Sequence, residues 1–267
     1  MEFSTDTIAA FDPAKKIVVL TGAGISAESG VPTFRGADGL WQRYRAEELA
    51  TPDAFAADPQ LVWEWYDWRR GIINKAEPNA GHLAIAEMER IFPLFSLITQ
   101  NVDGLHRRAG NKKIIEIHGN LWQLRCVRDG RVLEDLRVPL PVIPPLCECG
   151  ALLRPHVVWF GETLDQGDLA QAYSLIEACD LLLVVGTSAV VQPVASFPLI
   201  AKEAGARVFE VNKDPTPLSS LADAVFQGKA GEILPALLHP PAGSSCRILL
   251  PEEIKGHWRN ADEKIRS

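Results

Sequence analysis

The chain has 267 residues, 47% of them hydrophobic, and a formal net charge of −7. This is enough apolar content for one large domain, or for a domain with a smaller one inserted, and the negative charge argues against general nucleic-acid binding. The sequence shows neither a secretory signal nor an apolar run long enough to span a bilayer. Five cysteines, an odd number, fit a reducing compartment, so we expect a cytoplasmic protein with no membrane partner.

An apolar strand beginning at Val18 runs into a glycine pair and then into a helix start. Gly22 and Gly24 allow a tight turn and a close approach to a ligand, while free N–H groups and the positive end of the helix favour an anion. With Ala27 they satisfy the loose dinucleotide-binding pattern. On this motif alone, a phosphate site and a simple turn are equally good interpretations.

The region from about residue 40 to 92 breaks the strand pattern and is rich in helix formers. Its aromatic run, residues 63–70, places Tyr66 and Arg69 three positions apart, so that they share one face of a helix. A phenol and a guanidinium side by side could bind one carboxylate. The alternative is an aromatic helix packed in a small module, with Arg69 paired to a nearby acid.

Four later apolar runs, at residues 97–99, 114–117, 181–185 and 207–211, each end in polar residues. Short β-branched runs separated by helical stretches predict an α/β fold with a doubly wound parallel sheet of the Rossmann-like kind. Ligands of such sheets bind at the carboxyl ends of the strands, so we expect the polar tips to converge on one site. These tips include Gln100, Asn101, Asp103, His118, Gly186, Thr187, Ser188 and Asn212.

Together these motifs resemble the sirtuin family, NAD-dependent protein-lysine deacylases of the bacterial type. The resemblance is carried in the family's order by residues 22–41, 100–106, 117–120, 156–162, 186–188 and 211–212. It implies one catalytic domain over residues 1–240, followed by a C-terminal tail over 241–267. The large Rossmann-like part would comprise about 1–39, 93–120 and 155–240, and an inserted helical and cysteine-containing module about 40–92 and 121–154.

The resemblance implies His118 as the general base, because an imidazole titrates near neutral pH and can accept a proton from a ribose hydroxyl. Acyl-lysine and NAD+ would yield free lysine, nicotinamide and O-acyl-ADP-ribose. Asn101 and Asp103 would line the nicotinamide pocket, while His82, His106 and His156 look structural. The remaining residues that the resemblance assigns to NAD+ are Gly22, Ala23, Gly24, Ser26, Phe34, Arg35, Trp41, Gln100, Gly186, Thr187, Ser188, Asn212 and Ala230.

The same resemblance implies sites for the acylated protein substrate. Residues 157–162 match the strand that pairs with the substrate peptide and recognises its extended backbone, through Val157, Phe160, Gly161 and Glu162. Tyr66 and Arg69 match the Tyr-x-x-Arg signature of the subclass that removes succinyl and malonyl groups. Acetyl-lysine is also expected as a substrate.

A structural zinc ion is the second group that the resemblance implies. Sirtuins usually hold it with two pairs of cysteines, whereas here Asp129 stands where a second thiol is expected after Cys126. Cys147 and Cys149 form the other pair. Because zinc accepts oxygen ligands, these four residues could still form a tetrahedral site. The alternative is a module that has lost its metal.

Other functions on the same fold stay open. An NAD(P)-linked oxidoreductase would need a second strand with an acidic residue about 20 positions after the glycines, and residues 40–45 are not a strand pattern. The combination of His118, Asn101 and Asp103 argues against a non-catalytic NAD-binding protein. Mono-ADP-ribosyl transfer shares cleavage of the same bond. The sequence does not indicate an oligomeric state.

Overall fold

The structure is a computed structural model that describes residues 4–34 and 46–239. Its larger sheet has the strand order β3-β2-β1-β7-β8-β9, and all neighbouring strands are parallel. This confirms the predicted parallel sheet. The strands are β1 (Ile17–Thr21), β2 (Phe95–Thr99), β3 (Ile114–Glu116), β7 (Leu181–Val185), β8 (Arg207–Asn212) and β9 (Ala224–Gln227).

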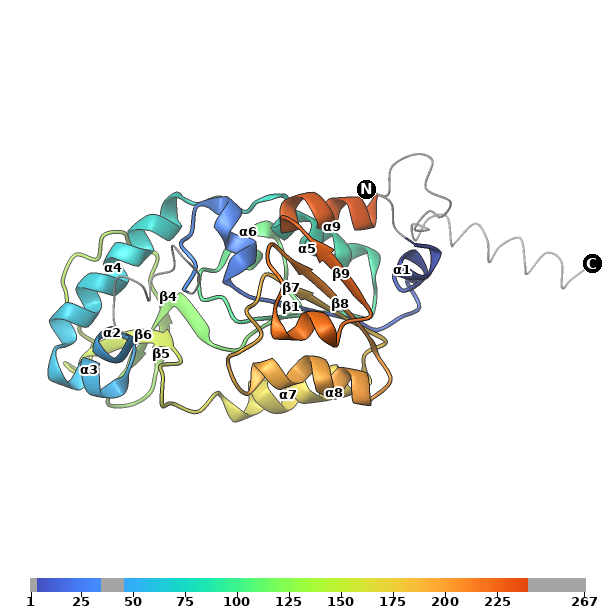
Figure 1. The fold of residues 1–267 in the computed structure, drawn as a ribbon. Coiled ribbons are helices and arrows are strands. Elements are labelled where there is room, and N and C mark those ends of the chain that lie inside the picture. Colours follow the sequence, from blue (N-terminus) through green and yellow to red (C-terminus); the bar gives the residue numbers. More distant parts are fainter. Residues whose placement is uncertain (1–3, 35–45, 240–267) are drawn as a thin grey trace, which may run out of the picture.

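Helices cover both faces of this sheet (Figure 1). On one face α5 (Ala80–Ile91) lies beside α9 (Ala230–Leu238), and on the other α7 (Gln166–Ala178) lies beside α8 (Phe197–Glu203). Val19 of β1 packs in the first core and Leu20 in the second. Because both faces are buried, the strands are apolar throughout rather than alternating. Shorter elements complete this part: α1 (Thr5–Ala9), the 3-10 helix η1 (Ala23–Ser29), α6 (Leu105–Ala109), η3 (Val194–Ser196) and η4 (Pro217–Ser220).

The chain order of the strands places a switch point at the centre of the sheet. From β1 the chain proceeds outward to β2 and β3 on one side, and later from β7 to β8 and β9 on the other. The carboxyl ends of β1 and β7, Thr21 and Val185, are therefore neighbours with connections that run in opposite directions. Ligands of open α/β sheets bind at such a point.

A second unit lies beside the large sheet (Figure 1). It consists of α2 (Ala46–Leu49), α3 (Pro52–Ala57) and α4 (Pro59–Lys75), with an antiparallel sheet in the order β5-β4-β6. The side chain of Asp58 caps α4 by accepting the N–H of Leu61 at 2.9 Å. None of the described helices combines the length and apolarity needed to cross a membrane. The strands of this sheet are β4 (Gly119–Cys126), β5 (Val132–Glu134) and β6 (Leu153–Val157).

The strand predicted for residues 157–162 is only partly present. Val157 is the last residue of β6, Phe160 and Gly161 form a turn, and Glu162 follows that turn. β6 contains Pro155, which cannot donate to a neighbouring strand. Of the residues expected to contact a peptide, Val157 therefore lies at the end of a strand, and the other three lie in the loop that follows it.

Candidate active site

The glycine loop after β1 packs directly against the loop after β7. The N–H of Gly22 donates to the carbonyl of Val185 at 3.0 Å, and that of Gly24 to the carbonyl of Gly186 at 2.8 Å. A Cβ on Gly22 or Gly24 would lie 2.8 Å or 2.7 Å from atoms of Gly186. The N–H groups of Gly22 and Gly24 are therefore bound within the protein and do not themselves face a ligand. These glycines are needed because two backbone segments meet at the switch point.

Asp103 presents a buried carboxylate whose orientation is fixed by hydrogen bonds. The hydroxyl of Ser26 donates to its Oδ2 at 2.7 Å, and the N–H of Leu105 donates to its Oδ1 at 2.9 Å. Asn101 joins the group by donating from Nδ2 to the Ser26 oxygen at 3.2 Å. Burial raises the pKa of Asp103, and the two donors and Arg69 oppose this rise. Three predicted site residues thus form one connected group.

His82 supports this group, although sequence reasoning gave it no place in the site. Its Nδ1 accepts the backbone N–H of Asn79 at 3.3 Å, so the proton of the neutral ring is on Nε2, 3.4 Å from the Ser26 hydroxyl oxygen. Burial lowers the pKa of His82 to about 4. At neutral pH it is therefore an uncharged donor. The sequence feature that indicates a structural role for His82 is the capping-box spacing Asn79-x-x-His82 at the start of α5.

His118 follows β3 and precedes β4, at the junction of the two sheets. Its Nδ1 lies 3.1 Å from the carbonyl oxygen of Gln100. A carbonyl only accepts, so Nδ1 carries the proton and Nε2 keeps its lone pair. Burial lowers the pKa of His118, partly offset by this hydrogen bond. Gly119 has a φ of +82°, and a Cβ there would overlap the carbonyl oxygen of His156, so only glycine allows the turn after the histidine.

Hydrogen bonds connect the carboxyl ends of three further strands. Gln100, after β2, donates to the hydroxyl of Thr187 at 2.9 Å, and Asn212 of β8 donates to the carbonyl of Thr187 at 2.8 Å. Ser188 is the next residue along the chain, and Ala230 begins α9. The predicted tips of β2, β7 and β8 thus converge at one edge. Arg35 and Trp41 lie outside the described residues.

Tyr66 and Arg69 lie on one face of α4, with exposed fractions of 3% and 5%. The Arg69 guanidinium is 4.6 Å from the ring centroid of Phe34 and 4.9 Å from that of Trp65. No carboxylate in the described ranges lies within ion-pair distance of it, so the alternative of a nearby acidic partner is not found there. The predicted acyl-binding arginine instead contacts Phe34, a predicted cofactor residue.

The loop after β6 is held by Glu162. Its carboxylate accepts from the Arg154 guanidinium, with Oε2 at 2.8 Å from Nη2, and also accepts the backbone N–H of Trp159 at 2.8 Å. The side chain of Glu162 is thus engaged within the loop. Phe160 is 45% exposed, and its N–H donates to the carbonyl of Ala50 at 2.9 Å.

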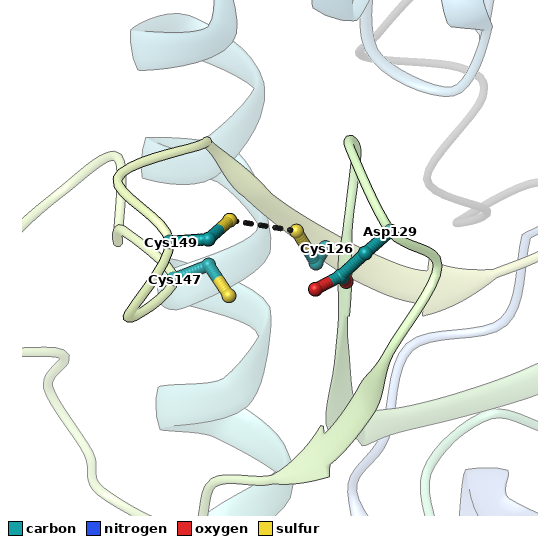
Figure 2. A group of neighbouring side chains, drawn as sticks. All are labelled: Cys126, Asp129, Cys147 and Cys149. Carbon is teal, nitrogen blue, oxygen red and sulfur yellow. Dashed lines mark hydrogen bonds between the residues drawn. The ribbon is translucent and has the colours of Figure 1, made fainter.

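Figure 2 shows the cysteine cluster of the small unit, with four side chains directed toward one another. The ligand atoms of Cys126, Asp129, Cys147 and Cys149 all lie within 4.8 Å of each other, and the sulfurs of Cys126 and Cys149 are 3.6 Å apart. A tetrahedral zinc ion with bonds of about 2.0–2.3 Å places its ligand atoms about 3.3–3.8 Å apart, so the Cys126–Cys149 separation fits such an ion, and any pair near the 4.8 Å limit would have to move closer to bind it. Hydrogen bonds from Arg131 and Cys126 lower the pKa of Asp129 to about 2, which keeps it ionised as a ligand must be.

The Sir2 family matches residues 22–193 of the chain. An NAD-dependent protein deacylase from Aquifex aeolicus is 60% identical over 215 residues, which are 80% of this chain and 90% of that protein. NAD-dependent protein deacylase 2 from Pyrobaculum aerophilum is 57% identical over 226 residues, 84% of this chain and 90% of that protein. The chain belongs to the Sir2 family. The resemblance to sirtuins is thereby confirmed.

Solved Sir2 structures have the same fold. A Sir2 homologue–NAD complex superposes with a TM-score of 0.83 at 50% identity and covers 88% of this chain and 93% of that one. A Sir2–p53 peptide–NAD+ complex gives a TM-score of 0.77 at 32% identity, covering 88% of this chain and 96% of that one. The Sir2 fold of this chain therefore includes both the Rossmann-like sheet and the smaller cysteine-containing unit, as predicted.

Proposed function

We propose that this Sir2 chain is an NAD+-dependent protein-lysine deacylase that removes succinyl and malonyl groups as well as acetyl groups. The observation that carries the activity is His118, a half-buried neutral imidazole with Nδ1 bound to a carbonyl and Nε2 left as a base. The names of the relatives and the peptide complex of a Sir2 structure support acylated proteins as substrates.

Bound NAD+ supplies the ribose that receives the acyl group and the nicotinamide that leaves. Acyl-lysine, NAD+ and water thus give lysine, nicotinamide and O-acyl-ADP-ribose. His118 Nε2 takes the proton of a ribose hydroxyl, which makes that oxygen a better nucleophile. Asp103, fixed by Ser26 and Leu105, accepts from the nicotinamide carboxamide, while Asn101 orders the ribose or a water. The zinc ion would cross-link the small unit and take no part in this chemistry.

The surroundings of Tyr66 and Arg69 are evidence that succinyl and malonyl groups are substrates. Both are buried, and within the described residues the Arg69 guanidinium contacts aromatic rings but forms no ion pair. Burying a cation is costly, and burial lowers the pKa of Arg69, an effect that the charges of Tyr66 and Asp103 oppose without an ion pair. The carboxylate of a succinyl or malonyl group would bring a negative charge into direct contact with Arg69 and accept hydrogen bonds from both side chains.

The test is to measure KM for succinyl-lysine and acetyl-lysine peptides with the wild-type protein and with the Arg69→Met variant. A charge-assisted hydrogen bond is worth about 1.5–3 kcal/mol, so the ratio of the succinyl KM to the acetyl KM should rise about tenfold to a hundredfold. Equal changes in both KM values would show that Arg69 is structural. Nicotinamide release and peptide mass are followed together. A gain in peptide mass by one ADP-ribose would instead identify mono-ADP-ribosyl transfer.

A further inference from the structure

Trp159 connects the acyl-binding helix to the loop that follows β6. Its indole Nε1–H donates to the hydroxyl oxygen of Tyr66 at 2.8 Å, and both side chains are buried, with exposed fractions of 3%. The two residues are 93 positions apart in the chain. This is a contact between the unit that would recognise the acyl group and the segment that would recognise the peptide.

The direction of this hydrogen bond restricts the orientation of the Tyr66 hydroxyl proton. An indole nitrogen is a donor only, so the phenol must be the acceptor and its own proton must point elsewhere. A phenolic O–H prefers the plane of its ring and therefore has two main orientations. Trp159 blocks one of them. Within the described residues no acceptor lies within hydrogen-bond distance of the Tyr66 proton, so its donor is free for a ligand.

We propose that Trp159 is a positioning residue for acyl specificity: its N–H fixes the Tyr66 hydroxyl in the orientation that donates to the carboxylate of an acidic acyl group. This inference rests on the proposed function, because it assumes that Tyr66 and Arg69 bind that carboxylate. The inference adds Trp159, which lies outside the Tyr-x-x-Arg pair, to the residues that determine acyl specificity.

The ring of Trp159 is held independently of its N–H. The Arg154 guanidinium lies 3.5 Å from its ring centroid, and the Phe55 ring lies 5.3 Å away, centroid to centroid. Its backbone N–H is bound to Glu162. A Trp159→Phe substitution therefore keeps an aromatic ring between Arg154 and Phe55 and removes the donor to Tyr66. The loop itself should stay in place.

The experiment measures KM for succinyl and acetyl peptides in the full chain carrying Trp159→Phe, Tyr66→Phe or both. Loss of one oriented hydrogen bond should raise the ratio of succinyl KM to acetyl KM about threefold to tenfold. With Tyr66 already replaced, Trp159→Phe should raise it no further, because the two residues act through one hydroxyl.

Trp63→Phe is the matched control. Trp63 is also a buried indole on the same helix as Tyr66, but its Nε1–H donates to the backbone carbonyl of Leu153 at 2.8 Å and not to the Tyr66 hydroxyl. Its loss should lower stability without changing the KM ratio. If Trp159→Phe does not fold, benzothienylalanine at position 159, which replaces the ring N–H by sulfur, tests the same hydrogen bond.

The possible outcomes separate this inference from the proposed function. If Arg69→Met and Tyr66→Phe raise the ratio but removal of the Trp159 N–H does not, the positioning role is wrong and the acyl preference stands. If Arg69→Met leaves the ratio unchanged, the acyl preference itself is wrong. Additive effects of Trp159→Phe and Tyr66→Phe would also overturn the positioning role.

Discussion

At the scale of single residues, His118 gives a direct prediction. Burial lowers its pKa below the usual value of about 6.5, and it must be uncharged to accept a proton. The acid limb of kcat/KM should therefore lie below pH 6.5, with activity lost as pH falls through the lowered pKa. His118→Ala should still fold and bind NAD+ in calorimetry but lose about 10²–10⁴-fold in kcat/KM. Turnover close to that of the wild type would contradict the assigned base.

The sequence indicates the reactive side chains better than the hydrogen bonds that hold them in position. His118, Asn101 and Asp103 are recognisable because each follows an apolar strand in a familiar motif. The hydrogen bonds of Gly22 and His82 were missed, since their partners, Val185 and Ser26, are distant in the chain. A local pattern does not indicate which distant atom will accept an N–H group.

At the scale of elements, the burial of a strand decides whether it can be predicted from the sequence. The strands of the large sheet are covered on both faces, so β7 appears in the sequence as an unbroken apolar run. β4 alternates irregularly, and its pairing with β6 shifts register between Asn120 and Leu124. Such a strand is defined by its partners rather than by its own pattern. The strand that the family resemblance implies over residues 157–162 ends at Val157.

The cysteine cluster joins β4 to the segment before β6, and Asp129 gives a prediction for this element. As the fourth ligand, it should contribute to zinc affinity, so Asp129→Ala should bind less zinc after exposure to a chelator and should melt at a lower temperature. The protein is purified without chelator, and metal content and thermal unfolding are measured.

Glu148→Ala is the matched control for the cluster. Its side chain is 92% exposed and pairs with Arg131 at 3.7 Å, the same arginine that contacts Asp129 at 3.0 Å, but Glu148 lies outside the four-residue set. This variant should keep its metal. If Asp129→Ala also keeps both metal and melting temperature, the three thiols hold the ion without the carboxylate.

At the scale of the whole molecule, the site depends on two units that meet at His118. β4 begins directly after this residue, and Trp122 of β4 donates its indole N–H to the carbonyl of Asp103 at 2.8 Å. Arg69 of α4 contacts Phe34, which follows η1 in the chain and packs against the core of the small unit. A change in the packing between the two units would therefore move the base His118, the nicotinamide pocket at Asp103 and the acyl site at Arg69 together.

Acid should unfold this molecule through its buried histidines. His82 and His106 are fully buried, with ring centroids 4.8 Å apart, and burial lowers both pKa values, that of His82 to about 4. An unfolded chain binds protons at these rings near pH 6.5, whereas the folded chain does not. Their contribution to stability is thus complete above about pH 6.5 and is lost as pH falls toward 4.

For His82 alone, this difference in pKa corresponds to about 2 kcal/mol of unfolding free energy lost between pH 7.5 and pH 5. His82→Gln should be less stable than the wild type at pH 7.5, because it disturbs the contacts to Asn79 and Ser26, but its stability should fall by about 2 kcal/mol less over the same interval. Urea unfolding at both pH values measures this, with His239→Gln, at a side chain 54% exposed, as control. If the variant and the wild type lose equal stability, acid sensitivity does not arise at His82.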